Sequence, residues 1–347
     1  MFSPNFNITN QTLNNIAKIE AAEEVIRHSP LLPLWEKQFK EDAIVRSAYH
    51  GTHIEGNMLR PDEAKDVLLG KDVLGRPRDI QEIINYRKVI ELIDEEAHKK
   101  IDKITEQLIK KLHRTITDKI LMPEQAGEYR LKQVVIRNSA TGEITFKPPP
   151  PMEVPFLMRE FVYWINKEDA DQIHPVLKAG IVHHELVRIH PFIDGNGRVA
   201  RVLATLILFL GGYDIRRFFS LEEYYDKDAV VYYENLGKAT SGNLTAWLEY
   251  FTYGASIEFT KTKEKILKLS KDVKLKEKIG GQQIFLTERQ IKIMEYIQEV
   301  GYLQNKSFNS LFPDISEDST LRDVQDLTKK GIIKKIGSTK SARYVMT

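Results

Sequence analysis

Apolar residues recur at helical spacing through most of the chain. Ile83, Ile84, Val89, Ile90 and Ile93 lie three or four positions apart and give one apolar face. The same spacing predicts helices over residues 154–165, 175–189, 229–239 and 246–259. A run with eight lysines over residues 261–278 predicts a further, solvated connecting helix. The pattern therefore indicates a mainly α-helical chain.

One short segment departs from this pattern. Residues 133–137 and 144–146 are rich in β-branched and apolar residues and flank a polar turn over residues 138–142, which predicts a β-hairpin. The four prolines at 148–151 follow directly and favour a rigid extended segment, because proline fixes φ and donates no hydrogen bond.

The residues with the clearest chemistry lie together from His190 to Arg201, in the order His-Pro-Phe-Ile-Asp-Gly-Asn-Gly-Arg-Val-Ala-Arg. An apolar run over residues 202–210 follows and ends at two glycines. This order predicts a loop that leads into the N-terminus of a buried helix. Free N–H groups and the positive end of the helix dipole then meet at residues 195–197, which predicts an anion site.

The residue types in this segment suit group transfer to a hydroxyl. His190 titrates near neutral pH and can accept a proton, while Asp194 is an oxygen ligand of the kind that Mg²⁺ takes. Arg198 and Arg201 share one helix face and can hold phosphate oxygens. Any one of these residues alone is more typical of a helix-capping loop with surface arginines. The whole set at this spacing favours nucleotidyl or phosphoryl transfer.

This segment resembles the signature of the Fic family, protein AMP-transferases of all-α fold, whose motif reads His-x-Phe-x-(Asp/Glu)-Gly-Asn-Gly-Arg-x-x-Arg. The resemblance implies that His190 deprotonates a Ser, Thr or Tyr hydroxyl of a target protein or of the chain itself. It also implies ATP as the AMP donor, with Asp194 holding Mg²⁺ on its phosphates and pyrophosphate as the second product. Further ATP contacts are implied for Gly195, Asn196 and Gly197, as the anion hole, and for Arg198 and Arg201. Glycine at 197 favours AMP transfer, because a kinase branch of the family carries lysine there.

A second constellation spans residues 51–57, Gly-Thr-His-Ile-Glu-Gly-Asn. Gly56 and Asn57 predict a helix end, so Glu55 falls in the last turn, where the helix dipole disfavours a negative charge and a cation should compensate. The segment resembles the inhibitory helix of Fic proteins, which implies that Glu55 pairs with Arg201 and makes ATP bind unproductively. The motif's Ser/Thr position falls on Gly51. The same resemblance leaves open AMP removal by this site, with Glu55 positioning a water.

Two further sets of residues take roles from the resemblance. The hairpin corresponds to the Fic flap, which aligns an extended piece of target through main-chain pairing, and Val134, Val135 and Ile136 would form its edge. The residues alone are equally compatible with a hairpin packed on the core. Tyr232 and Tyr233 would line the adenine pocket of ATP, although tyrosines at this spacing more often pack in cores.

The tail predicts three helices and a hairpin: a capped helix starting at residues 286–290, a short helix over 308–312, a helix over 321–330, and strands over 332–336 and 342–346. This order is typical of a winged helix-turn-helix. DNA binding would use Arg322, Gln325 and Lys329 on the third helix and Lys340 and Arg343 on the wing. Asp323 and Asp326 argue against it, because acids repel phosphate. A protein-docking or oligomerisation role stays equally open.

The expected fold is thus a mainly α Fic-type helical bundle with a β-hairpin flap and a C-terminal winged helix-turn-helix. We expect a helical regulatory region over residues 1–105, a catalytic domain over 106–258, a connecting helix over 259–280 and the winged helix over 281–347.

Composition narrows the setting and leaves two functions. The 347 residues carry a net charge of only +2 and no cysteine, which excludes a disulfide framework and thiolate metal sites. No signal peptide or membrane span is expected, so we predict a cytoplasmic protein. The favoured function is an autoinhibited protein adenylyltransferase that uses ATP and Mg²⁺. The alternative is an ATP-sensing, DNA-binding transcriptional regulator. The sequence leaves open whether the chain forms a homodimer.

Overall fold

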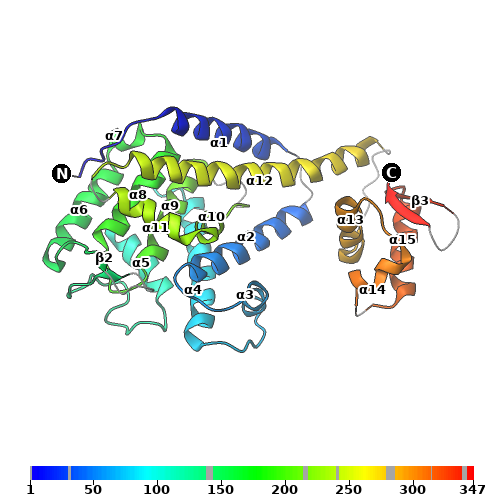
Figure 1. Cartoon of the computed structure of the whole chain (residues 1–347), viewed down its shortest axis with the longest axis horizontal. Coiled ribbons are helices and arrows are strands. Elements are labelled where there is room, and N and C mark those ends of the chain that lie inside the picture. The colour runs from blue at the N-terminus through cyan, green and yellow to red at the C-terminus, as the bar shows by residue number, and fades with distance from the viewer. Residues whose placement is uncertain are drawn as a thin grey trace. The chain divides into compact units, whose positions relative to one another are not determined.

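Helices make up most of the computed structural model, which confirms the mainly α fold class (Figure 1). The structure describes residues 2–29, 33–137, 144–213, 218–239, 242–278, 286–313, 315–337 and 342–347. Two compact units emerge, Met1–Leu267 and Lys268–Thr347. Each unit is described by itself below.

The first unit is a helical bundle around two central helices. Its N-terminal half contains α1 (Asn10–His28), α2 (Pro33–His53), α3 (Pro61–Leu68), α4 (Pro77–His98) and α5 (Glu106–Ile116). The second half contains η1 (Pro151–Glu153), α6 (Val154–Ile165), α7 (Glu168–Asp171), α8 (Pro175–Ile189), α9 (Asn196–Leu210), α10 (Leu221–Lys227), α11 (Ala229–Lys238) and most of α12 (Thr245–Lys278). The bounds of α6 and α8 match the helices predicted over 154–165 and 175–189.

Helices α8 and α9 form the centre of the core, because both are buried on nearly every face. Gly180 lets α8 approach α12 closely, since a Cβ there would lie less than 3.0 Å from Leu248. The Trp247 indole donates to the Gly180 carbonyl across this contact at 2.7 Å. On the opposite side of α12 lies α1, whose Asn15 side chain donates to Thr252 at 3.1 Å (Figure 1). These contacts make α8 and α9 a rigid support for the loop between them.

The predicted hairpin is present but shorter than expected. Strand β1 (Ile136–Arg137) pairs antiparallel with β2 (Ile144–Phe146), with Ile136 opposite Phe146 and an irregularity after it. The prediction that Val134 and Val135 lie in the strand is wrong, because β2 is too short to pair with them. The predicted turn over residues 138–142 lies outside the described residues.

Helix α12 also corrects the sequence prediction. The two helices expected over 246–259 and 261–278 form one continuous helix from Thr245 to Lys278. No proline or glycine follows residue 254 within it, so nothing in the backbone ends the first helix before the lysine-rich run begins. The division between the two units falls within this helix, at residues 267 and 268.

The second unit has a small core of its own. It contains α13 (Glu288–Val300), η4 (Asn305–Ser307), α14 (Phe308–Leu311), α15 (Glu317–Lys329), β3 (Ile333–Ile336) and β4 (Arg343–Met346), with β3 and β4 paired antiparallel. Ile293, Ile297, Phe308, Leu327 and Tyr344 are among its buried residues. Thr287 and Gln290 form the predicted capping box. The third helix begins at Glu317 with Ser316 as its cap, four residues earlier than predicted.

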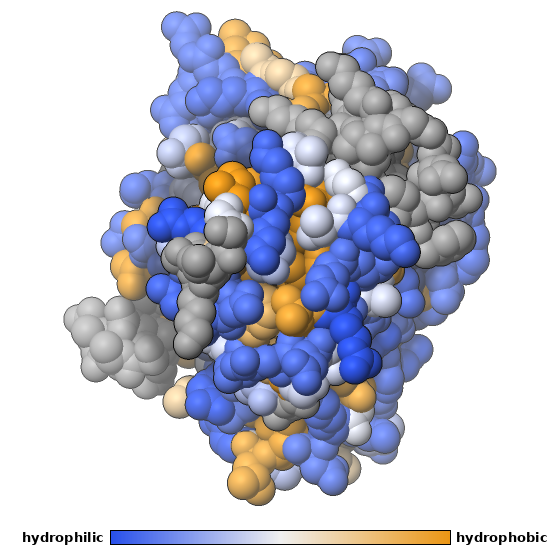
Figure 2. Space-filling view, turned by 90° about the vertical axis from the view of Figure 1, so that its right-hand side faces the viewer, coloured by the Kyte–Doolittle hydropathy of each residue, from blue (hydrophilic) through white to orange (hydrophobic). Residues whose placement is uncertain are grey.

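The structure contains no helix among its described residues that combines the length and apolar character needed to cross a bilayer. The face drawn in Figure 2 is mostly hydrophilic, and its hydrophobic residues form small separate groups.

Candidate functional site

The segment predicted to carry the chemistry forms the loop between α8 and α9. His190 ends α8 in a left-handed conformation, with φ 50° and ψ 59°. A residue other than glycine rarely adopts this conformation, and such strain is typical of functional sites. The Nδ1 atom of His190 lies 3.3 Å from the Val187 carbonyl, so this nitrogen carries the proton. The Nε2 atom is then left with a lone pair.

Burial lowers the pKa of the His190 imidazole, with a further lowering by the charge of Arg130. The Val187 carbonyl and the carboxylate of Glu55 act in the opposite direction, but the net pKa is below its ordinary value of 6.5. His190 is therefore neutral at pH 7 and ready to accept a proton.

The start of α9 has the capped geometry on which the predicted anion site depends. Gly195 caps the helix with φ 77°, which favours glycine. The buried Asn196 side chain exchanges two hydrogen bonds of 2.9 Å with the backbone of Phe192 and so closes the loop on itself. Asn196, Gly197 and Arg198 make up the first turn, where backbone N–H groups have no acceptor within the helix. The loop thus leaves these N–H groups without acceptors in the helix, as an anion site requires.

The structure places the carboxylate of Glu55 at this point. Its Oε1 atom lies 2.9 Å from Nη2 of Arg201. A Cβ added to Gly197 would lie less than 3.0 Å from the same oxygen, so the carboxylate covers the first turn of α9. Glu55 follows the end of α2 in a turn over residues 54–56, slightly later than the predicted last helical turn. The compensating cation predicted for Glu55 is therefore Arg201.

Arg201 is almost completely buried and keeps unused donors. Its Nη2 atom also donates to the Gly51 carbonyl at 2.9 Å. The Nε and Nη1 atoms have no acceptor within the described residues. Buried donors are rarely left without partners. The donor set therefore suits a ligand with more acceptor oxygens than one carboxylate supplies.

Arg198 and Asp194 belong to a neighbouring ionic network. Arg198 donates a hydrogen bond to Glu82 on α4 at 3.1 Å. The Asp194 carboxylate accepts hydrogen bonds from Arg78 at 2.7 Å and from the Gly195 N–H at 2.6 Å. Burial alone would raise the pKa of Asp194, but Arg198, Arg78 and the amide lower it overall. Asp194 is thus an ionised, partly exposed carboxylate.

These properties fit a Mg²⁺ ion that takes most of its ligands from phosphate and water. Within the described part of the chain, no group of three or more His, Cys, Asp or Glu side chains could hold a metal ion by itself. A Mg²⁺ ion on Asp194 would therefore depend on a bound phosphate.

The comparisons with known proteins agree with this geometry. The family model described as Fic/DOC matches residues 103–208, which include α5, the hairpin, α8 and most of α9. Residues 103–208 are therefore similar to the Fic/DOC family. Protein adenylyltransferase Fic of Drosophila melanogaster and that of Drosophila grimshawi are each 34% identical to this chain over 179 residues. The match covers 51% of this chain and 35% of either relative, so the chain spans about a third of their length.

Solved Fic structures share the fold. A Fic family protein from Desulfovibrio desulfuricans superposes with a TM-score of 0.68 over 100% of this chain and 98% of that chain, at 22% identity. A Fic domain containing signaling protein from Bacteroides thetaiotaomicron gives a TM-score of 0.62 at 26% identity, over 76% of this chain and 97% of that chain. The Fic fold is therefore shared well beyond the motif.

The two tyrosines predicted for the Fic nucleotide pocket lie in different surroundings. Tyr232 is 1% exposed, and its hydroxyl is hydrogen-bonded to His183 at 2.8 Å. Its ring stacks on Tyr225, so Tyr232 lies in the core of this structure, and its contact with adenine stays a prediction. Tyr233 is 45% exposed and donates to the carbonyl of Ile54, next to Glu55, at 3.3 Å. Tyr233 is the tyrosine of this pair whose ring is accessible to a ligand.

Two residues that hold the Fic loop were not predicted. The buried His113 accepts the Gly127 N–H on Nδ1 at 2.8 Å, and its Nε2 lies 3.0 Å from the Asp194 carbonyl. Its ring stacks on Phe192 with centroids 3.8 Å apart. Arg130 donates to the His190 carbonyl at 2.8 Å. Neither residue lies in the motif, and no local pattern in the sequence indicates these contacts.

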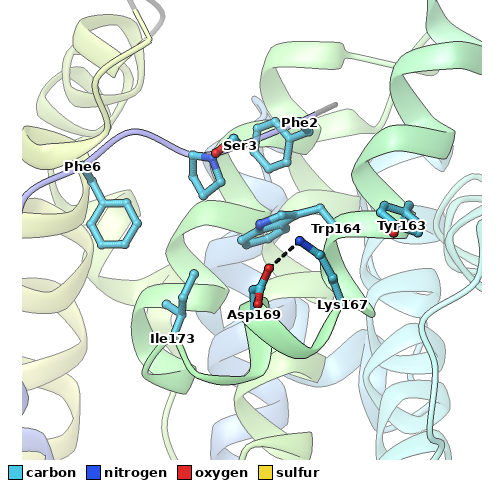
Figure 3. Close-up of a pocket in the computed structure, with 9 residues that line it drawn as sticks. Phe2, Ser3, Phe6, Tyr163, Trp164, Lys167, Asp169 and Ile173 are labelled. Atoms are coloured by element: carbon cyan, nitrogen blue, oxygen red, sulfur yellow. Dashed lines mark hydrogen bonds and ion pairs between the residues drawn. The ribbon is translucent and has the colours of Figure 1, made fainter.

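A cavity of about 280 Å³ lies elsewhere in the unit, under the N-terminal arm (Figure 3). Phe2 packs edge-on against Trp164, and Lys167 forms an ion pair with Asp169 beside it. Its lining residues include neither Glu55 nor any residue of the loop between α8 and α9. The candidate site is therefore the loop between α8 and α9, and not this cavity.

Proposed function

We propose that this protein transfers AMP from ATP to hydroxyl groups of proteins. The single observation that carries the proposal is the geometry of the loop: His190 ends α8 before the first turn of α9, and Arg201 one turn later keeps two buried donors that have no acceptor among the described residues. The phosphates of ATP would lie over this turn, held by its N–H groups and by Arg198 and Arg201. The named activity of the Drosophila relatives supports AMP transfer over other uses of a bound triphosphate.

The reaction follows from the tautomer of His190. A Ser, Thr or Tyr hydroxyl oxygen of the target attacks the α-phosphorus, and its proton moves to Nε2 of His190. The bond from that phosphorus to the pyrophosphate oxygen breaks, and pyrophosphate leaves. Asp194 would hold Mg²⁺, which neutralises phosphate charge when bound. The hairpin around Ile136 would align the target, and the accessible ring of Tyr233 would contact the adenine.

We further propose that Glu55 inhibits this transfer. Its carboxylate takes the position at Gly197 where a phosphate would be bound, and it uses Arg201 at the same time. This charge-assisted contact stabilises the inhibited state by about 1.5–3 kcal/mol. Its loss should therefore raise the rate of AMP transfer roughly tenfold or more.

Isotope position distinguishes the possible reactions. The full chain is incubated with Mg²⁺ and ATP labelled at the α- or the γ-phosphate, with and without candidate protein acceptors. We expect α-label in protein, no γ-label, and a mass increase of about 329 Da for AMP on the modified residue. Glu55→Gly should raise incorporation and His190→Ala should abolish it, while the exposed Glu124→Gly serves as the matched control. Incorporation of γ-label, or α-label that survives His190→Ala, would contradict the proposal.

A second candidate, DNA binding by the C-terminal unit, is favoured by the orientation of two acids. The Asp323 carboxylate accepts a hydrogen bond from Arg289 at 2.7 Å. The Asp326 carboxylate accepts one from Gln290 at 2.6 Å. The exposed positions of α15 include Arg322, Gln325 and Lys329. The objection that these acids repel phosphate is therefore weaker than it is from sequence alone.

The C-terminal unit can be tested separately from the chemistry. Lys340, predicted for the wing, lies outside the described residues, and Arg343 contacts the ring of Tyr302. A mobility shift with random duplex DNA at moderate salt should weaken when Arg322 and Lys329 are both changed to alanine. If the unchanged protein shifts no duplex, DNA binding and the ATP-sensing regulator are both rejected.

A further inference from the structure

Arg130 is a buried arginine outside the family motif. It precedes the hairpin by six residues and is only 3% exposed. The described residues include no carboxylate that forms an ion pair with it. A buried charge without an ionic partner is costly, so its hydrogen bonds indicate why it is present.

All of the side-chain hydrogen bonds of Arg130 go to backbone carbonyls. Nε donates to His190 at 2.8 Å, Nη1 to Lys132 at 3.2 Å and Nη2 to Pro149. Its own backbone N–H donates to the Pro191 carbonyl at 2.9 Å. Lys132 comes before β1 and Pro149 comes after β2, so the guanidinium joins both ends of the hairpin to the loop that carries His190.

Only arginine can make this set of contacts from one position. Its planar guanidinium has five donors in a fixed geometry, whereas lysine offers one ammonium that cannot reach three divergent carbonyls. The acceptor at His190 is the carbonyl of the residue in the left-handed conformation. Holding that carbonyl fixes ψ of His190 and therefore the direction in which its imidazole projects.

We propose that Arg130 is a positioning residue that couples the hairpin to the base His190. A target strand that pairs with the hairpin moves its two ends together, and the guanidinium passes that movement to the His190 backbone. Target engagement would then set the base in its reactive position. This inference rests on the proposed function, in which His190 is the base and the hairpin aligns the target.

The charge of Arg130 has a second effect on the same residue. Together with burial it lowers the pKa of His190, against the raising effects of Val187 and Glu55. Two variants separate the geometric effect of Arg130 on His190 from its electrostatic effect. Arg130→Lys keeps the positive charge but loses the planar set of donors, whereas Arg130→Gln loses the charge.

The test uses the full chain carrying Glu55→Gly, with Arg159→Lys and Arg159→Gln as controls at an exposed position on α6. Arg130→Lys should lower kcat for AMP transfer by roughly 10- to 100-fold through misplacement of the base. KM for ATP should stay within about twofold, because the phosphate contacts are intact. Arg130→Gln should also move the acidic limb of the pH–rate profile to higher pH. An unchanged kcat in Arg130→Lys overturns the proposal.

Nuclear magnetic resonance of the His190 imidazole gives a readout that does not depend on activity. Arg130→Lys should shift the His190 signals, and Arg130→Gln should raise the titration midpoint of His190, whereas both Arg159 variants leave them unchanged. If the Glu55→Gly parent transfers no AMP, the proposed function fails, and the imidazole signals still decide the role of Arg130. Thermal denaturation identifies a variant that has not folded, in which case the remaining Arg130 variant is decisive. Unchanged His190 signals in a folded variant overturn the coupling.

Discussion

The phenol ring of Tyr86 fills the space beside Gly51. A Cβ added to Gly51 would lie less than 3.0 Å from two carbons of that ring and from its hydroxyl oxygen. The hydroxyl of Tyr86 donates to the buried Glu222 at 3.0 Å, which fixes the ring in place. Gly51 stands at the Ser/Thr position of the inhibitory motif, so Tyr86 explains why this chain carries glycine there. The Gly51 carbonyl remains available and accepts from Arg201.

Gly51→Ser should therefore weaken inhibition, although it restores the family residue. The new side chain would collide with Tyr86 and push the end of α2, which leads to Glu55, away from Arg201. We expect α-label incorporation to rise by on the order of tenfold, comparable to the loss of one charge-assisted contact. Combining Gly51→Ser with Tyr86→Ala should return the rate toward that of Tyr86→Ala alone. A Gly51→Ser protein that is more inhibited than the parent would contradict this explanation.

Asp226 on α10 should hold the end of α2, which leads to Glu55, in place. Its carboxylate accepts from Nδ1 of both His50 and His53 at 2.8 Å, and these histidines lie in the last turns of α2. Asp226→Ala should raise AMP transfer severalfold by freeing the segment that precedes Glu55. In a Glu55→Gly background the same change should add nothing, because both act on one contact. An equal rise in the AMP-transfer rate in both backgrounds would show that Asp226 does not act through Glu55.

Glu82 should contribute strongly to the stability of the first unit. It accepts from Arg198, which is 2% exposed, at 3.1 Å and from Arg78 at 3.0 Å. Glu82→Ala leaves a buried guanidinium with only Asp194, which costs about 3 kcal/mol of unfolding free energy. Urea unfolding followed by tryptophan fluorescence measures this, since all three tryptophans lie in the first unit. The exposed Glu91→Ala is the control and should cost about 0.5 kcal/mol or less.

The first unit should lose stability as the pH falls from 6.5 to 4. Burial lowers the pKa of His113 and that of His184 to about 4, from 6.5. The unfolded chain binds these protons below pH 6.5 while the folded unit does not, so acid favours unfolding. Each histidine accounts for at most about 3 kcal/mol over this window. Urea midpoints at several pH values check this, and a His113→Gln variant should show a shallower fall. A midpoint independent of pH over this range would contradict the assignment.

The sequence predicted the parts of the fold that depend on local patterns. Residues 175–189 and 154–165 carry unbroken helical spacing, and the structure has α8 and α6 at those bounds. The errors lie where local signals were ambiguous. Ser316 and Ser319 are both good caps, and the structure uses Ser316. The length of β1 depends on its partner strand, which nothing in its own residues specifies.

The candidate site shows the same division. The loop from His190 to Arg201 is contiguous, so its glycines, caps and dipole could be read without the rest of the chain. His113 on α5, Arg130 in the segment before the hairpin and Arg78 on α4 all approach this loop. No spacing in the sequence relates them to it. The sequence could not show that Tyr232 is buried and Tyr233 is exposed, because burial depends on packing and not on residue type.

The sequence by itself determined the helical fold class and the order of groups around the start of α9, because periodicity and capping act between neighbours in the chain. Only the tertiary structure decided that Glu55 covers Gly197, that Tyr86 takes the space at Gly51, and that Arg130 ties the hairpin to His190. These contacts join residues that lie 35 to 146 positions apart in the sequence. The guanidinium of Arg130 also contacts more than one segment at once. Packing of whole helices, which no local pattern encodes, sets the distances between them.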